Sequence, residues 1–242
     1  RPLTCDVPKP MVPIANRPMM EYIIRLLCRH GLRDIAVTTC YLPENIEEYF
    51  GSGEGWGARL TYFVEDQPLG TAGSVKNASD YLDESFLVIS GDCLADFDLQ
   101  AAIAYHRENQ ALATIVLTRV ASPLEYGVVF TNGAGKVERF LEKPSWGEVF
   151  SDKVNTGIYI LEPEVLQLVP AGVQRDFSRD LFPLLLQEQE RLYGYIANGY
   201  WSDIGNLEQY IQSHLDLMTG KVKAAITGTP RDGIWTEAGA WV

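Results

Sequence analysis

Apolar residues in the first half of the chain recur with two different spacings. Short apolar runs bounded by polar residues predict buried strands, and apolar residues three or four positions apart predict helices. The expected strands span residues 34–39, 59–64, 86–90 and 113–119, and the expected helices span residues 19–30, 42–50, 72–81 and 99–109. This alternation is typical of a mostly parallel sheet with helices on both faces.

The second half of the chain has a different pattern. Asn132-Gly133, between the apolar-rich segments 127–131 and 136–141, predicts a β-hairpin. We then expect strands at 154–161 and 192–197, and helices at 178–189 and 206–219. Together the two halves predict one α/β domain over residues 1–222, with a mixed, mostly parallel sheet flanked by helices.

Residues 223–242 form a tail of another kind. Glycine and small residues recur at short intervals, and Ile234 and Ala240 are six positions apart. That spacing is compatible with the start of a hexapeptide, left-handed β-helix. An irregular tail is the alternative, because one coil of such a helix cannot bury itself.

Composition and charge exclude several classes of partner. The 242 residues are 46% hydrophobic and carry a formal net charge of −12, which disfavours binding to nucleic acid. No apolar run approaches the roughly 20 residues needed to span a bilayer, and the N-terminus lacks a signal-peptide pattern. We therefore expect a cytoplasmic protein without a membrane partner. The four cysteines show no zinc or redox spacing, and we expect reduced packing residues.

Two aspartates mark the candidate chemistry. Asp92 ends the run Phe86-Leu-Val-Ile-Ser-Gly-Asp, and Asp203 lies in Trp201-Ser-Asp-Ile-Gly205. A carboxylate at the carboxyl edge of a parallel sheet lies where open α/β sheets bind ligands. Two such carboxylates together with substrate phosphates suit Mg²⁺. Considered singly, either residue is equally compatible with a turn or a helix cap.

Other polar segments are suited to phosphate and sugar binding. Lys9 lies between two prolines, which hold it on a stiff segment, and the alternative is an exposed surface lysine. The loop 67–74 contains glycines ahead of a helix, a setting for ligand contact or for a structural turn. Glu142-Lys143 suits a sugar phosphate, with the amide of Asn155 for a further hydroxyl, although an exposed Glu-Lys pair is common.

In order and spacing, these motifs resemble the sugar-1-phosphate nucleotidyltransferases. The resemblance rests on the segments Arg1-Pro-Leu-Thr4 with Pro8-Lys-Pro10, Leu69-Gly-Thr-Ala-Gly73, Gly91-Asp92, Glu142-Lys-Pro144, Asn155-Thr-Gly-Ile-Tyr159 and Trp201-Ser-Asp-Ile-Gly205. It covers residues 1 to about 220 and is closest to bacterial mannose-1-phosphate guanylyltransferases, including those fused to a phosphomannomutase-like part. Glucose-1-phosphate nucleotidyltransferases are similar. The family's glycine-rich loop is represented only by its last residues, 1–4, and we expect its first strand and glycines to lie outside this sequence.

The resemblance implies a Rossmann-like domain that joins a nucleoside triphosphate and a sugar-1-phosphate into an NDP-sugar and pyrophosphate, with Mg²⁺ as cofactor. The preferred pair is GTP with mannose-1-phosphate, and glucose-1-phosphate with UTP, dTTP or ATP is the alternative. It also implies a homo-oligomer. Alternatives of another class are a catalytically silent regulatory sensor of sugar nucleotides and an unrelated Rossmann-like binding protein.

The resemblance also assigns roles to individual residues. The implied catalytic residues are Arg1, Lys9 and Asp92, and the implied metal ligands are Asp92 and Asp203. The implied nucleotide-binding residues are Gln67, Gly70, Thr71, Ala72, Gly73 and Gly91. The implied sugar-phosphate-binding residues are Tyr126, Gly127, Glu142, Lys143 and Asn155.

Overall fold

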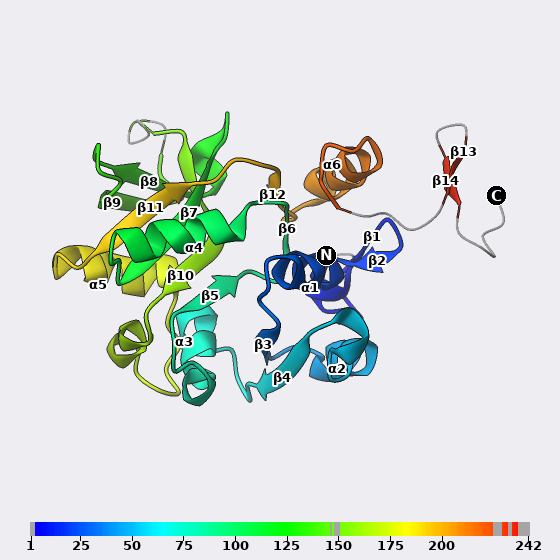
Figure 1. Ribbon diagram of the computed structural model, residues 1–242, viewed down its shortest axis with the longest axis horizontal. Coiled ribbons are helices and arrows are strands. Elements are labelled where there is room, and N and C mark those ends of the chain that lie inside the picture. Colours follow the sequence, from blue (N-terminus) through cyan, green and yellow to red (C-terminus); the bar gives the residue numbers. More distant parts are fainter. Residues whose placement is uncertain (1–2, 146, 148–150, 225–228, 232–233, 237–242) are drawn as a thin grey trace.

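The computed structural model describes residues 3–145, 147, 151–224, 229–231 and 234–236 (Figure 1). Its main sheet has six strands. Five of them lie in the order β11-β7-β10-β8-β9, and the sixth, β5, also pairs with β10. The strands are β5 (Phe86–Ile89), β7 (Ala113–Arg119), β8 (Gly127–Thr131), β9 (Val137–Glu142), β10 (Lys153–Leu161) and β11 (Leu192–Ile196).

Strand direction agrees with the expected mixed sheet. β10 pairs antiparallel with β5, β7 and β8, so these three strands share one direction. β11 runs parallel to β7, whereas β9 runs antiparallel to β8. Most strands therefore point one way, and their carboxyl ends meet at one edge of the sheet, where ligands of α/β proteins bind.

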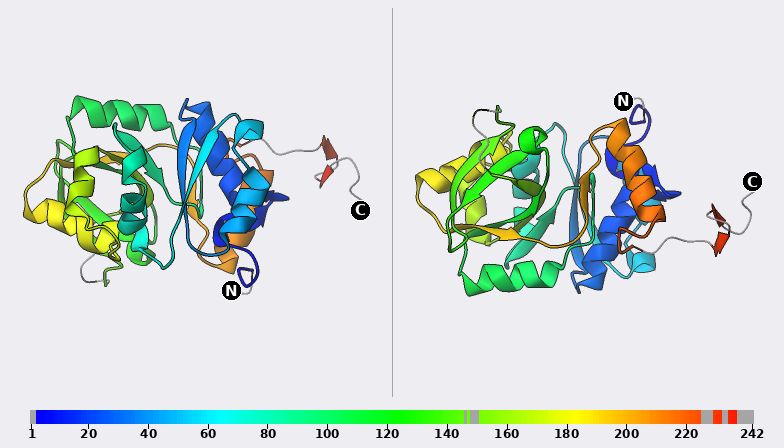
Figure 2. Two further views of the ribbon diagram at one scale, coloured as in Figure 1. Left: turned by 90° about the horizontal axis from the view of Figure 1, so that it is seen from below. Right: turned by 90° about the horizontal axis from the view of Figure 1, so that it is seen from above.

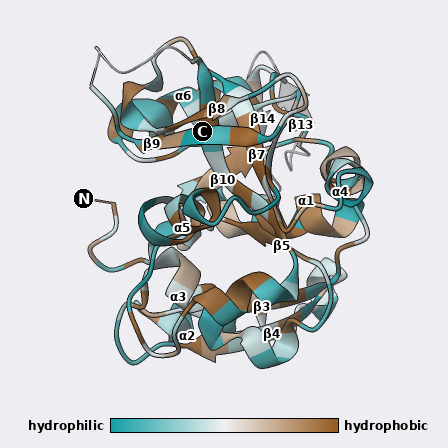
Figure 3. Ribbon diagram, turned by 90° about the vertical axis from the view of Figure 1, so that its left-hand side faces the viewer, coloured by the Kyte–Doolittle hydropathy of each residue, from teal (hydrophilic) through white to brown (hydrophobic). Residues whose placement is uncertain are grey.

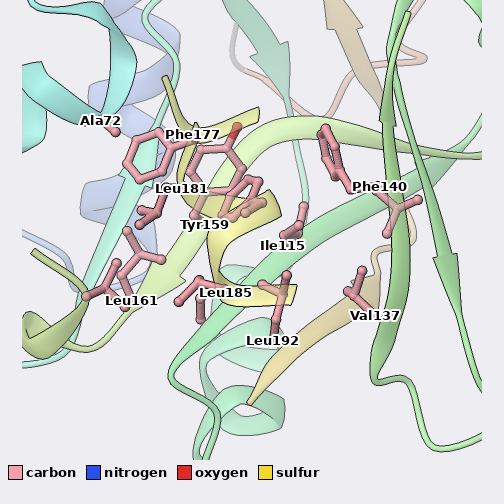
Figure 4. Packing of buried hydrophobic residues seen from close by; sticks show 14 of the residues in the cluster. Ala72, Ile115, Val137, Phe140, Tyr159, Leu161, Phe177, Leu181, Leu185 and Leu192 are labelled. Atoms are coloured by element: carbon pink, nitrogen blue, oxygen red, sulfur yellow. The ribbon is translucent and has the colours of Figure 1, made fainter. Parts of the chain in front are cut away.

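Helices cover both faces of the sheet because alternate residues of its central strands are apolar. On β10, Tyr159 and Leu161 pack into one cluster with α3 (Gly70–Asn77) and α5 (Phe182–Gln187). Ile158 and Ile160 pack into another with α1 (Met19–Arg29) and α4 (Leu99–Glu108). This period of two places α4 and α5 on opposite faces (Figure 2). Apolar colouring accordingly gathers along β5, β7 and β10 (Figure 3), and aromatic rings fill the α5 side (Figure 4).

A smaller unit lies beside this sheet. β3 (Asp34–Thr39) and β4 (Arg59–Val64) form a separate parallel pair, packed against α1 and α2 (Pro43–Phe50). A cavity of about 290 Å³ lies between β3 and β5 and is lined by residues of both strands.

Short elements complete the fold. They are the pair β1 (Pro13–Ile14) and β2 (Arg17–Pro18), the pair β6 (Cys93–Ala95) and β12 (Trp201–Asp203), α6 (Leu207–Met218), and single turns of 3₁₀ helix at Lys9–Met11, Glu54–Trp56, Ser79–Tyr81 and Pro123–Glu125, with a longer one at Pro163–Leu168. Two expected helices are shorter than predicted. The first is α3, followed by the turn at Ser79–Tyr81, and the second is α5, preceded by a π-helical turn at Phe177–Leu181.

The tail contains β13 (Thr229–Arg231) and β14 (Ile234–Thr236), which pair antiparallel. Successive coils of a β-helix pair parallel instead, so the expected β-helix start is not confirmed, and Ala240 lies outside the described residues. Within the described part of the chain, every helix is too short or too polar to cross a bilayer.

Candidate active site

The two predicted metal ligands lie next to each other. β6 and β12 pair antiparallel with Asp203 opposite Cys93, and Ile204 donates its backbone N–H to the carbonyl of Asp92 at 3.2 Å. Both carboxylates reach the same ammonium group: Lys9 Nζ is 2.5 Å from Asp92 Oδ2 and 3.8 Å from Asp203 Oδ1. The fold thus brings together three residues that the sequence places far apart.

Lys9 is held by the stiff segment on which it lies. It begins a 3₁₀ turn in which Met11 N–H donates to the Pro8 carbonyl at 2.8 Å. Pro10 packs directly on Gly91: a Cβ at Gly91 would lie 3.1 Å from Pro10 Cγ. The glycine before Asp92 therefore permits the close approach that sets Lys9 against the carboxylates.

The proximity of the two carboxylates makes ionisation of Asp203 less favourable, and a nearby cation opposes this effect. Partial burial, and next the neighbouring Asp92, raise the pKa of Asp203, against the opposing effect of Lys9 and Lys143. Asp92 is held by Lys9 and also by Ser90, whose hydroxyl donates to Oδ1 at 2.5 Å. The site therefore favours a ligand that brings positive charge between the two acids.

The donor set fits a hard divalent cation such as Mg²⁺. Both available groups are carboxylates, which are oxygen donors of the kind that Mg²⁺ prefers. In the structure the ammonium of Lys9 lies near both carboxylates. Among the described residues, no group of three or more His, Cys, Asp or Glu side chains is arranged to hold a metal. Substrate phosphate oxygens would therefore have to complete the coordination.

The predicted sugar-phosphate residues of β8 and β9 lie beside the acidic pair. Gly127 pairs with Glu142, and Lys143 donates its N–H to the carbonyl of Tyr126 at 3.2 Å. Lys143, at φ +45°, turns out of the strand and lowers the pKa of Asp203. The two segments thus contribute a cation, an acid and a phenol to the same region.

Tyr126 is positioned by partners that sequence reasoning missed. Its ring packs edge-on against Trp201 at 5.3 Å, and its hydroxyl accepts a hydrogen bond from Gln209 Nε2 at 3.1 Å. Gln209 lies in the first turn of α6, and its Oε1 also accepts from Gly205 N–H at 2.9 Å. Nothing in its sequence setting separates Gln209 from a surface glutamine.

Asn155 makes its hydrogen bonds within the protein. Its Oδ1 accepts from Gly157 N–H at 2.9 Å, and its Nδ2 donates to Tyr159 at 3.0 Å and Ser178 at 3.3 Å. These contacts stabilise the irregularity in β10 between residues 155 and 159. A sugar hydroxyl would have to use the remaining lone pair of Oδ1 or displace a partner, so the expected ligand role stays a prediction.

The glycines in the first turn of α3, Gly70 and Gly73, accommodate protein backbone. Ala72 and Gly73 donate their N–H groups to the carbonyl of Arg175, at 2.9 and 3.0 Å, and Thr71 donates to Asp176. A Cβ at Gly70, which has φ +72°, would lie 2.6 Å from that carbonyl oxygen. Segment 173–176 was not singled out in the sequence, and it occupies donors that the motif was expected to offer a ligand.

Of the remaining predicted residues, Gln67 is exposed just ahead of this loop, and Arg1 lies outside the described residues. The nucleotide roles expected for Gln67 and residues 70–73 stay predictions.

A cavity of about 700 Å³ opens at the carboxyl end of β3, next to Lys9. Thr38, Thr39 and Tyr41 line it from β3 and the residues after it, and Thr4 and Cys5 line it from the N-terminal segment. The hydroxyl of Thr39 is the one buried side-chain polar atom in the described part of the chain that lacks a hydrogen-bond partner. Since such groups are normally paired, this hydroxyl points to an interaction that the structure does not contain.

Comparison with known proteins places these features in a family. A family model described as nucleotidyl transferase matches residues 1–220. The chain belongs to this family. Its resemblance to sugar-1-phosphate nucleotidyltransferases is thereby confirmed, because similar proteins carry such names.

Two curated relatives and one solved structure show how far the similarity extends. This chain is 38% identical to a UTP–glucose-1-phosphate uridylyltransferase of Synechocystis sp., over 98% of its own length and 65% of that protein. It is 34% identical to a mannose-1-phosphate guanylyltransferase of Mycobacterium tuberculosis, over 91% of its length and 61% of that protein. The chain spans less than two thirds of either relative. HddC from Yersinia pseudotuberculosis has the same fold, with a TM-score of 0.76 and 25% identity over 88% of this chain and 91% of that one.

We predict that Gly70→Ala lowers the free energy of unfolding by about 1–3 kcal/mol. The alanine would combine φ +72° with a contact to the Arg175 carbonyl oxygen. Gly133→Ala is the matched control, because a Cβ there meets nothing within 4 Å. Urea unfolding of both variants measures the difference; equal stabilities would show that segment 173–176 does not press on the loop.

We predict that the pKa of Asp203 lies above that of ordinary aspartates and falls in Asp92→Asn. Removing the neighbouring charge favours the ionised form of Asp203, and it also frees Lys9 to pair with that residue. Because the pKa is raised, Asp203 loses its charge on acidification at a higher pH than an exposed aspartate does. Carboxyl ¹³C NMR titration of metal-free protein measures both values. Titration of Asp203 together with the exposed aspartates would contradict this account.

Proposed function

We propose that this chain transfers a nucleotidyl group from a nucleoside triphosphate to a sugar-1-phosphate. A phosphate oxygen of the sugar phosphate attacks the α-phosphorus, the bond to the bridging oxygen of the β-phosphate breaks, and pyrophosphate leaves. The observation that carries the proposal is the convergence of Asp92 and Asp203 on Lys9 at the carboxyl edge of the fold. Family membership supports it, since the relatives have names that describe this class of reaction.

The proposed reaction requires that the two substrates be aligned and that their negative charge be compensated. It does not require a strong base. A sugar phosphate is already an anionic nucleophile, so the protein must bring two polyanions together in line. Lys9, next to the cavity beyond β3, is placed to hold phosphates of the nucleotide. Lys143, on the β9 side, acts electrostatically on Asp203 and would hold the phosphate of the sugar. In a chain of net charge −12, these two local cations make anion binding possible.

Asp92 and Asp203 are the residues that would hold Mg²⁺. When bound, the ion supplies charge stabilisation to the reacting phosphates. The short contacts of Asp92 with Lys9 and Ser90 fix the orientation of its carboxylate before substrate arrives. Lys9 would have to exchange its carboxylate partners for phosphate oxygens when the cation enters.

The choice of base and sugar is a finer proposal. We propose GTP and mannose-1-phosphate as the substrate pair, on the motif resemblance to the guanylyltransferase branch. Relatives named for glucose-1-phosphate with UTP and for mannose-1-phosphate match at similar identity, 38% and 34%. UTP with glucose-1-phosphate is therefore the second candidate.

We predict that Asp92→Asn lowers kcat by a factor on the order of 10²–10³ or more, the scale of losing a preorganised electrostatic group. Asp83→Asn removes the same charge from an exposed position outside the site and should leave kcat unchanged. Pyrophosphate release with a fixed substrate pair measures both variants. A small loss in Asp92→Asn would mean that the acidic pair does not act on the reacting phosphates.

A screen of GTP, UTP, dTTP and ATP against mannose- and glucose-1-phosphate tests the proposed reaction itself. We expect pyrophosphate release with Mg²⁺ present, strongest for GTP with mannose-1-phosphate. A stronger signal for UTP with glucose-1-phosphate would reverse the finer assignment. Binding of nucleotide without release for any pair would favour a silent regulatory sensor instead.

A further inference from the structure

The side chain of Gln209 joins two segments of the candidate site. Its Oε1 accepts from the backbone N–H of Gly205, two residues after Asp203, at 2.9 Å, and its Nε2 lies 3.1 Å from the hydroxyl of Tyr126. The side chain of Asn206 caps α6 by accepting from the N–H of Gln209 at 2.9 Å. Gln209 is therefore fixed through its backbone and through both ends of its amide.

These partners determine which way round the amide of Gln209 lies. A backbone N–H can only donate a hydrogen bond, so the amide atom that faces Gly205 is the oxygen. The NH₂ group consequently faces Tyr126. Because an amide NH₂ can only donate, the phenol oxygen of Tyr126 is the acceptor in this hydrogen bond.

The hydrogen of the Tyr126 hydroxyl is left for a different acceptor. Within the described part of the chain, this hydroxyl accepts from Gln209 and makes no further hydrogen bond. A phenol can donate one hydrogen bond while it accepts another. The contact with Gln209 therefore keeps Tyr126 available as a donor to a group that binds at the site.

Tyr126 is connected to both the acidic pair and Lys143. Burial, and next the charge of Asp203, raise the pKa of Tyr126, which indicates that the phenol lies near that carboxylate. The backbone carbonyl of Tyr126 accepts from the N–H of Lys143 at 3.2 Å. Its ring packs edge-on against Trp201, whose indole N–H donates to the carbonyl of Thr156 at 2.9 Å. The ring and the hydroxyl are thus both held in place beside the residues expected to bind phosphate.

We propose that Gln209 is a positioning residue that keeps the Tyr126 hydroxyl as a hydrogen-bond donor to an oxygen of the sugar-1-phosphate. Glutamine suits this role, because its uncharged amide offers one acceptor to Gly205 and one donor to Tyr126 at the same time. The role rests on the proposed function, in which Lys143 holds the phosphate of the sugar.

Gln209→Glu reverses the polarity of the contact. One carboxylate oxygen still accepts from Gly205, but the other can only accept from Tyr126 and takes up its hydroxyl hydrogen. We expect the KM for the sugar phosphate to rise on the order of tenfold, the scale of one lost hydrogen bond. The KM for the nucleoside triphosphate and kcat should stay unchanged, as expected when a contact equally present in the ground state and the transition state is lost. Steady-state pyrophosphate release with the preferred substrate pair measures all three values.

Gln209→Met separates this role from a purely structural one. Methionine removes both hydrogen bonds of the amide but leaves the Tyr126 hydroxyl free to donate. We therefore expect a smaller rise in the KM for the sugar phosphate than in Gln209→Glu. A purely structural role predicts the opposite order, because the methionine variant loses more contacts. Circular dichroism melts of all variants report whether the fold is retained.

Two further variants complete the experiment. Tyr126→Phe removes the donor itself and should raise the KM for the sugar phosphate as much as Gln209→Glu does. The double variant should show no further rise, because both changes remove the same contact. Asn206→Asp is the matched control, since it adds the same charge at the start of α6 and preserves the cap, and it should leave the KM unchanged.

The possible failures are distinguishable. An unchanged KM for the sugar phosphate in Gln209→Glu would overturn the role of Gln209 and leave the proposed function in place. An equal rise in Asn206→Asp would also overturn it, because added charge alone would then account for the effect. If the unaltered chain releases no pyrophosphate from any substrate pair, the proposed function fails, and the role of Gln209 fails with it.

Discussion

The position of the acidic pair depends on one short piece of backbone pairing, that of β6 with β12. These strands are separated by most of the main sheet in sequence, yet three residue pairs hold them together. Asp92 directly precedes β6 and Asp203 ends β12, so this ladder alone makes the two carboxylates neighbours. Trp201 reinforces the ladder, because its Nε1 donates to the carbonyl of Thr156 in β10 at 2.9 Å. The β6–β12 pair is therefore linked to the main sheet through the side chain of Trp201 rather than through the acids themselves.

The charges of Lys9, Asp92 and Asp203 then determine which ligands the site can bind. Two carboxylates around one ammonium leave the cluster with an excess of negative charge, and the partial burial of Asp203 makes that charge costly. Such a cluster is unfavourable in an isolated protein but suits a site that receives a cation together with anionic substrate groups. In the proposed reaction, Lys9 and Lys143 would supply positive charge locally, although the chain as a whole is acidic.

Strands and helices with a clear spacing of apolar residues were predicted well, because that spacing is a property of the local sequence. The expected bounds of β3, β4 and β7 agree with the structure to the residue. The proximity of Asp92 and Asp203 was also expected from motifs, whereas the ion pairs of Lys9 with these acids were not. In contrast, β6 and β12 were missed, since three residues are too few to show a period. No motif indicated that Gly70 packs against Arg175, a residue distant in sequence. The hydrogen bonds of Asn155 to Gly157, Tyr159 and Ser178 were likewise not foreseen. Thr39 is a further example, since only three-dimensional packing shows that its hydroxyl is buried without a partner.

The brevity of the β6–β12 ladder has a consequence for how chains of this type can vary in length. Side chains alternate between the two sides of a strand, so inserting or deleting one residue between Asp92 and Ala95 would shift the register and turn Asp203 away from Lys9. Loops on either side of the ladder face no such constraint. Length differences among such proteins should therefore collect in connecting segments, while the spacing within Cys93–Ala95 and Trp201–Asp203 stays constant.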